Sequence, residues 1–151
     1  MPPLDSFLRL LLAAGLGAAI GLEREYRKKP AGLRTNILIA LGAALFTIMS
    51  IQLAQIGGTP DRIAAQIVTG MGFLGGGAIL RSGTGIKGMT TAATIWVNAA
   101  IGMAAGSGQY ALATMATAIT LVVLAVLAPI EAFFERRAGG TDLNDHARRE
   151  I

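Results

Sequence analysis

The residues of this chain that best suit chemistry are a series of glycines, a few carboxylates and two side-chain amides. Residues 70–75, GMGFLG, match G-x-G-x-x-G, the string in which backbone N–H groups hold a pyrophosphate at a helix N-terminus. Such a site also needs a strand before the glycines and an acid about 20 residues after them. Residues 63–69 instead continue an apolar run, and residues 88–130 contain no acid. The glycines therefore do not predict a nucleotide-binding enzyme.

The supply of catalytic and metal-ligating residues is small. Cysteine is absent, and His146 in the polar tail is the single histidine, which removes disulfides, thiolate chemistry and most zinc sites. A magnesium path would use carboxylates with retained waters, and the apolar runs after the first contain none in their uncharged cores. We therefore expect no catalytic residue and no cofactor, with Glu23, Gln66 and Asn98 as weak metal candidates.

The distribution of charge indicates that lipid surrounds these residues. The chain is 53% hydrophobic and 15% charged, against about 25% charged in an average soluble domain. No charged residue occurs in ranges 35–60, 63–80 and 88–130. The pattern predicts an all-α polytopic membrane helix bundle. The net charge of +4 is then explained by cationic loops beside membrane spans, so we expect no nucleic-acid partner.

The lengths of the apolar runs predict about five transmembrane helices. As one helix, residues 88–130 would be about 64 Å long, twice the hydrocarbon thickness, so we expect a turn at Gly106-Ser107-Gly108. Arg9 can snorkel to the interface and pair with Asp5, four residues earlier. The predicted spans are about 4–22, 36–56, 63–80, 91–105 and 109–130, within a transmembrane domain 1–135 that precedes a short polar cytoplasmic tail, 136–151.

The basic residues predict the orientation. Eleven of the thirteen Lys and Arg fall in the first loop, the third loop and the tail, all on one side of a five-span protein; only Arg9 and Arg62 fall on the other. The positive-inside rule then places the N-terminus outside and the C-terminus in the cytoplasm. The basic cluster that follows the first run, at residues 24–29, also argues against a cleaved signal peptide.

Small and polar residues recur on common faces of the predicted helices. Glycines four apart favour close packing between helices in lipid, whereas an unwound triplet at residues 75–77 would instead expose carbonyls to an ion. Polar faces indicate either interhelical hydrogen bonds or a hydrophilic path for a cation. The glycine pairs are Gly17 and Gly21, Gly72 and Gly76, and Gly102 and Gly106. The polar faces hold Asn36, Thr47 and Ser50; Gln66, Thr69 and Gly70; Thr91, Thr94, Asn98 and Gly102; and Thr114 and Thr117.

Two charged or polar segments at the predicted cytoplasmic margin each allow two interpretations. Glu23 can pair with Arg24, Arg27 or Arg34, or it can bind a metal at the interface. Residues 81–91 form a loop rich in glycine and hydroxyl groups before a helix, which Thr90 can cap. The free N–H groups there can alternatively bind phosphate or an anionic lipid headgroup.

Three ordered segments resemble the MgtC/SapB family of bacterial inner-membrane proteins. They are GLEREYRKKPAGLRTNILIALGAALFT at 21–47, DRIAAQIVTGMGFLGGGAILRSG at 61–83 and GMTTAATIWVNAAIGMAAGSG at 88–108. Longer members carry a soluble domain after the last span, and this chain resembles a short form without it. The resemblance implies a multi-pass protein linked to magnesium limitation and, in pathogens, to virulence inside host cells.

The resemblance also implies regulation of other membrane proteins, with ATP synthase and magnesium pumps as partners. From the family motifs we expect functional sensitivity at Glu23, Arg24, Arg34, Thr35, Gln66, Thr91 and Asn98. Our leading hypothesis is a non-enzymatic inner-membrane protein of magnesium homeostasis that forms a homo-oligomer in the lipid bilayer. The alternative is a transporter or channel for Mg²⁺ or another cation through a polar interhelical path.

Overall fold

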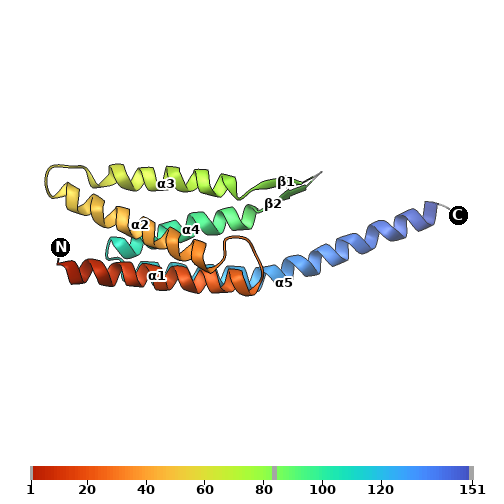
Figure 1. The fold of residues 1–151 in the computed structure, drawn as a ribbon. Coiled ribbons are helices and arrows are strands. Elements are labelled where there is room, and N and C mark those ends of the chain that lie inside the picture. Colours follow the sequence, from red (N-terminus) through yellow and green to blue (C-terminus); the bar gives the residue numbers. More distant parts are fainter. Residues whose placement is uncertain (1, 83–84, 150–151) are drawn as a thin grey trace.

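In its described residues the chain folds into five helices and one short hairpin, which confirms the predicted all-α membrane helix bundle. The computed structural model describes residues 2–82 and 85–149 (Figure 1). The elements are α1 (Pro3–Tyr26), α2 (Leu33–Ala54), α3 (Pro60–Gly77), β1 (Leu80–Ser82), β2 (Gly85–Lys87), α4 (Met89–Gly106) and α5 (Tyr110–Arg149). Prolines at the first turns of α1 and α3 fit there because those positions need no N–H donor.

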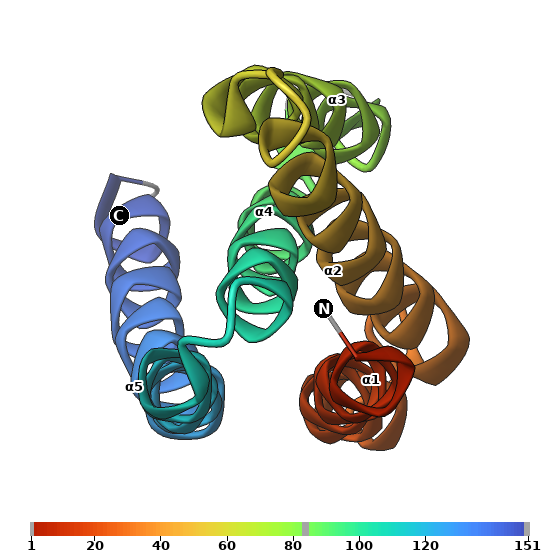
Figure 2. The same cartoon turned by 90° about the vertical axis from the view of Figure 1, so that its left-hand side faces the viewer.

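The helices run alternately back and forth, so the connections gather at two ends of the bundle (Figure 1). The α1–α2 loop, the hairpin and the far part of α5 lie at one end. The α2–α3 loop and the turn after α4 lie at the other. That turn forms where expected, with Gly108 at φ 83°, a value that glycine adopts without strain. Viewed along the bundle, α4 lies at the centre and contacts the other four helices (Figure 2).

Three helical segments of the described part of the chain are long and apolar enough to cross a membrane: α1, α2 and Tyr110–Leu127 of α5. The two remaining helices, α3 and α4, have 18 residues each. Large apolar side chains cover much of the outer surface, for example Leu38, Phe73 and Ile119, each more than three-fifths exposed. Such a surface suits lipid, because water would penalise it.

Three local features differ from the sequence prediction, and a fourth excludes the unwound alternative for the glycine triplet. Residues 81–91 are not a plain loop, because β1 and β2 pair antiparallel with Arg81 opposite Ile86. Thr90 does not cap α4; the N-cap is Gly88, at φ 93°, and no side chain caps this end. The helix α5 continues through Pro129 to Arg149, across the predicted tail, and α3 stays helical through the glycine triplet up to Gly77.

The buried apolar side chains form two clusters on either side of α2 and α4. One cluster joins α1, α2, α4 and α5 and includes Ile20 and Ile101, both almost fully buried. The other joins α2, α3 and α4 through Ile39, Ile67 and Ile95. Both clusters hold α4 in place, and α4 carries the polar residues described next.

Candidate functional site

Glycines let α1 approach α2 at backbone distance. A Cβ atom built on Gly17 would lie 2.6 Å from the carbonyl oxygen of Asn36, and one on Gly21 would lie 2.7 Å from the Cα atom of Leu33. Real Cβ atoms essentially never come so close, so any larger residue would push the helices apart. Close backbone packing of this kind stabilises helix pairs in lipid.

Glycines on α4 make the same kind of contact with α2. A Cβ atom on Gly102 would overlap the carbonyl oxygen of Ala40, and one on Gly106 would lie 2.6 Å from that of Ala44. Ala40 and Ala44 are themselves fully buried. The helices α1, α2 and α4 therefore form a tightly packed core, which we call the three-helix core.

Two asparagines bind each other at the centre of the three-helix core. Asn98 of α4 donates from Nδ2 to the backbone oxygen of Asn36 at 2.7 Å and to its Oδ1 at 3.1 Å. Asn36 in turn donates from Nδ2 to the carbonyls of Ala31 and Gly32, one turn earlier. Both asparagine side chains are fully buried. Their polar faces meet, as expected for α2 and α4, and the amide dipoles fix the register of the two helices.

Arg24 is buried at the end of α1, which the sequence did not indicate. Its side chain is 3% exposed, and its Nη2 donates to the hydroxyl of Thr91, in the first turn of α4, at 2.6 Å. The structure therefore joins two residues of the predicted functional set that are 67 positions apart.

Arg27, which pairs with Glu23, connects the end of α1 to α5. The Nε of Arg27 lies 2.6 Å from Oε1 of Glu23, and its Nη2 donates to the carbonyl of Ala125 at 3.1 Å. Ala125 is four residues before Pro129, which has no N–H to offer that carbonyl. Arg27 thus satisfies the acceptor that the proline leaves open. A proline inside a helical run leaves one carbonyl without its backbone donor, so Pro129 indicated that another donor was needed. The sequence could not identify that donor as Arg27.

A second polar contact closes the opposite end of the bundle. Arg9 pairs with Asp5 at 2.8 Å, as expected, and its Nη1 donates to the carbonyl of Gly106 at 2.9 Å. The guanidinium also lies 5.9 Å from the centre of the Tyr110 ring. Because Arg9 has a carboxylate, a carbonyl and an aromatic face around it, its charge is well compensated.

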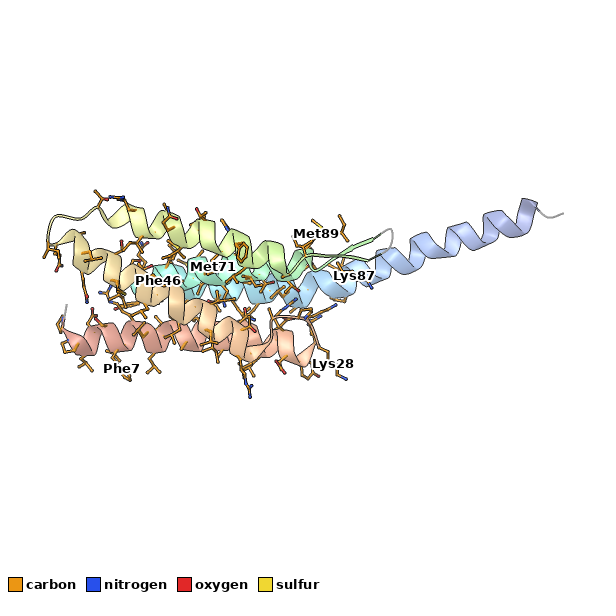
Figure 3. The ribbon with its side chains drawn as sticks, turned by 45° about the horizontal axis from the view of Figure 1, so that its top comes forward. Phe7, Lys28, Phe46, Met71, Lys87 and Met89 are labelled. Carbon is orange, nitrogen blue, oxygen red and sulfur yellow. The ribbon has the colours of Figure 1, made fainter. Side chains whose placement is uncertain are left out.

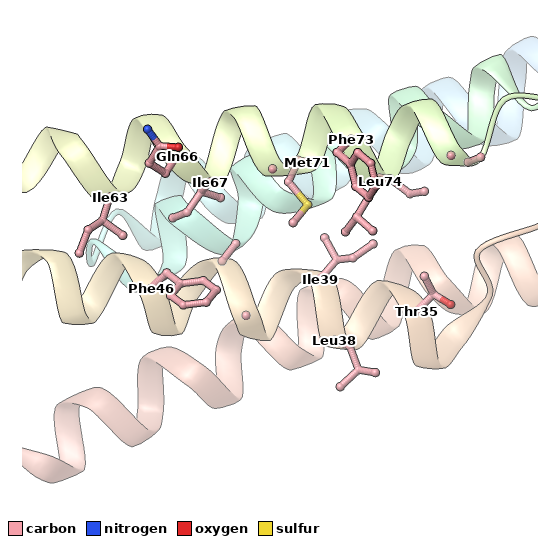
Figure 4. A pocket seen from close by; sticks show the side chains of 16 residues that line it. Thr35, Leu38, Ile39, Phe46, Ile63, Gln66, Ile67, Met71, Phe73 and Leu74 are labelled. Carbon is pink, nitrogen blue, oxygen red and sulfur yellow. The ribbon is translucent and has the colours of Figure 1, made fainter.

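The side of the bundle formed by α2 and α3 is open. A groove of about 910 Å³ lies between these helices, lined mainly by apolar side chains such as Ile39, Phe46, Met71 and Leu74 (Figure 4). Gln66 lines this groove.

Several of the expected contacts do not form within the chain. Gln66, Thr69 and Gly70 are exposed, so the predicted meeting of this polar face with the other helices is wrong. Gly72 and Gly76 contact no other helix, since a Cβ on either would meet nothing within 4 Å. The prediction that these two glycines pack against a helix therefore stays a prediction, and it applies to a helix of another molecule.

The remaining candidates are not brought together into one site. Arg34 and Thr35 are exposed at the start of α2, and Thr35 lines the groove. The weak metal candidates Glu23, Gln66 and Asn98 lie on α1, α3 and α4, and no hydrogen bond among the described residues joins them. Among the side chains that the structure describes, which exclude those of residues 131–149, no group of three or more His, Cys, Asp or Glu could hold a metal ion.

Comparison with known proteins identifies the class of this bundle. The model of the MgtC family matches residues 10–133, which is most of the chain. The protein therefore belongs to the MgtC family, and three of its described helical segments are long and apolar enough to cross a membrane.

Three relatives show the extent of the similarity. A protein of Synechocystis sp., named as uncharacterised, is 45% identical over 94% of this chain and 61% of its own length. YhiD of Escherichia coli K12, named as a candidate magnesium transporter, is 52% identical over 81% of this chain and 60% of its own. Protein MgtC of Salmonella typhimurium is 52% identical over 76% and 48%. The chain thus spans about half to three-fifths of these relatives, and no solved structure gives a significant match.

Proposed function

We propose that this protein is a multi-pass protein of the bacterial inner membrane that acts in magnesium homeostasis without catalysis, through self-association and regulation of other membrane proteins. One observation carries the proposal: the buried amides of Asn36 and Asn98 bind each other, so the three-helix core is closed by its own polar groups. The groove between α2 and α3 and the exposed face of α3 remain for partners. Membership in the MgtC family supports the link to magnesium.

The proposed topology has five membrane-crossing helices, an outside N-terminus and a cytoplasmic C-terminus. The arrangement of the loops supports it, because Lys28 of the first loop and Lys87 of the hairpin lie at the same end of the molecule (Figure 3). Basic residues retain the loops that carry them on the cytoplasmic side. Reporter fusions at Lys29 and Lys87 should both report cytoplasm, and one at Gly58 should report periplasm.

The regulatory role is tested by affinity capture of the tagged full chain from its native membrane at low and at high magnesium. We expect a defined membrane complex, such as ATP synthase or a magnesium pump, to be enriched at low magnesium. The control is another tagged multi-helix protein from the same membrane. Equal recovery of every membrane protein with both baits, at both magnesium levels, would contradict the proposal.

Self-association can be mapped with single cysteines, because the chain has none of its own. Gly76→Cys lies on the exposed face of α3, and Ile119→Cys lies on the exposed, purely apolar face of α5. We expect oxidative crosslinking in membranes to join two copies through the α3 position and not through the α5 position. A monomer at both positions, together with a monomer mass in native mass spectrometry, would count against self-association.

Cation transport is the second candidate, and the name of YhiD favours it. A path would have to pass Asn98, whose Oδ1 has no partner among the described residues. Flux of Mg²⁺ into liposomes by the purified chain, lost in Asn98→Leu, would establish transport. The absence of flux for every tested cation would retire it.

A further inference from the structure

The guanidinium of Arg24 is a buried cation with donors that nothing in the described chain uses. Arg24 is 3% exposed, and its one acceptor there is the neutral hydroxyl of Thr91. Its Nε–H group has no partner among the side chains and backbone atoms that the structure describes. Arginine carries five N–H donors and remains charged in proteins, so one neutral oxygen leaves most of its hydrogen-bonding capacity unmet.

The nearby carboxylates make no ion pair with Arg24. Glu23 adjoins Arg24 in sequence and its charge acts on the guanidinium, but its Oε1 pairs with Nε of Arg27 at 2.6 Å, and its Oε2 has no hydrogen-bond partner among the described residues. The Oε2 of Glu25 accepts the backbone N–H of Leu33 at 3.1 Å. Among the side chains that the structure describes, which exclude those of residues 131–149, no carboxylate lies within ion-pair distance of Arg24, and a buried charge is costly unless it is paired.

Arg24 is directed at the first turn of α4, where the first backbone N–H groups also lack a hydrogen-bond acceptor. The helix has 18 residues, and no side chain caps its N-terminus at Gly88. The first backbone hydrogen bond of α4 runs from the N–H of Ala92 to the carbonyl oxygen of Gly88. The N–H groups of residues 89–91 are therefore free for an external acceptor. The hydroxyl of Thr91 also keeps its own proton available, since it accepts from Arg24.

The end of the molecule that holds Arg24 is cationic. Lys28 and Lys87 lie there together, beside the α1–α2 loop and the hairpin (Figure 3). Both side chains are exposed, as is Arg34. An approaching anion would therefore meet a favourable field before it reached the buried guanidinium.

We propose that Arg24 and the first turn of α4 form a binding site for a phosphate oxyanion, supplied by an anionic lipid headgroup or by inorganic phosphate. Arg24 provides the charge and the fork of donors, and the helix provides free N–H groups and the positive end of its dipole. Thr91 holds the guanidinium against this turn. The site does not depend on the regulatory function proposed above, because it requires only the geometry of α1 and α4.

The test compares two lipids and two arginines in the purified full chain. Native mass spectrometry would count phosphatidylglycerol and phosphatidylcholine retained by the protein, and thermal shift would follow titration with inorganic phosphate. We expect Arg24→Gln to weaken binding of the favoured phosphate ligand about tenfold, which corresponds to loss of one charge-assisted contact. Arg9→Gln is the matched control, because Arg9 already contacts Asp5 and Gly106.

Each outcome decides the matter. Selective retention of phosphatidylglycerol supports a lipid source, and stabilisation by inorganic phosphate that is lost with Arg24 supports a soluble one. Equal weakening by Arg9→Gln, or binding of neither ligand by the unmodified chain, would overturn the proposal. Should Arg24→Gln fail to fold, Arg24→Lys keeps the charge while removing the guanidinium fork, and it should weaken binding less than Gln but measurably.

Discussion

The three-helix core and the α2–α3 side of this protein use the same residue types to different ends. In the core, Gly17 and Gly102 touch the backbone of α2, and the side-chain amide of Asn98 donates hydrogen bonds to Asn36. On the α2–α3 side, Gly72 and Gly76 meet nothing, and Gln66 is exposed beside an open groove. The difference teaches that small and polar residues on a membrane helix define a contact face, while the partner of that face depends on where the helix is placed.

The largest effect should come from filling a core glycine. Gly102→Leu would drive a side chain into the backbone of α2 at Ala40, and we expect it to lower the free energy of unfolding by about 3 kcal/mol. Gly76→Leu, on the open side, should change the same quantity by less than about 0.5 kcal/mol in the monomer. Both can be measured as thermal unfolding in one detergent. Equal loss in the two variants would remove the distinction between the regions.

A smaller effect should follow loss of the central amide. Asn98→Leu removes two hydrogen bonds to Asn36, and we expect a loss of about 1–2 kcal/mol. Gln66→Leu should leave stability unchanged or slightly raised, because a lipid-facing amide is replaced by an apolar side chain. The midpoints of detergent unfolding curves would separate the two. A greater loss for Gln66→Leu would mean that α3 is buried more deeply than the chain alone shows.

The link between the core and α5 can be isolated with a double-mutant cycle. Arg27→Leu should cost about 1 kcal/mol because the carbonyl of Ala125 loses its donor. In a Pro129→Ala background the cost should fall, since the restored N–H at position 129 can bind that carbonyl. Loss of the Glu23 pair occurs in both backgrounds and cancels in the cycle. Identical costs in both backgrounds would show that Arg27 does not act through this carbonyl.

The smallest effect is expected within the groove itself. A Cβ atom on Gly42 of α2 or on Gly70 of α3 would meet nothing within 4 Å. Gly42→Ala and Gly70→Ala should therefore raise the unfolding free energy by no more than about 0.5 kcal/mol, through reduced backbone freedom of the unfolded chain. Thermal unfolding of each variant in detergent checks this expectation. A clear loss of stability would mean that the groove is closed by tight contact in solution.

Much of the fold was predictable from the sequence because the uncharged runs have about the length of a membrane-spanning helix. Uncharged runs predicted five helices, and Gly106-Ser107-Gly108 predicted the turn that divides the longest run. The hairpin at residues 80–87 and the helix beyond Pro129 were not predicted, since short strands carry little periodicity and a proline usually marks a helix end. The predicted capping by Thr90 was wrong because Gly88, next to the carbonyl of Ala78, is the N-cap of α4 instead.

For the candidate site, too, some features follow from the sequence and others only from the tertiary structure. The sequence by itself determined that Asn98 and Thr91 share one face of a helix, because residues seven apart lie on the same side at 3.6 residues per turn. Only the tertiary structure decided that Asn98 reaches Asn36 and that Arg24, expected beside water, is buried against Thr91. Periodicity fixes which way a side chain points around its own axis. The neighbour it meets depends on how the helices cross, and here that is set by how closely glycines let one backbone approach another.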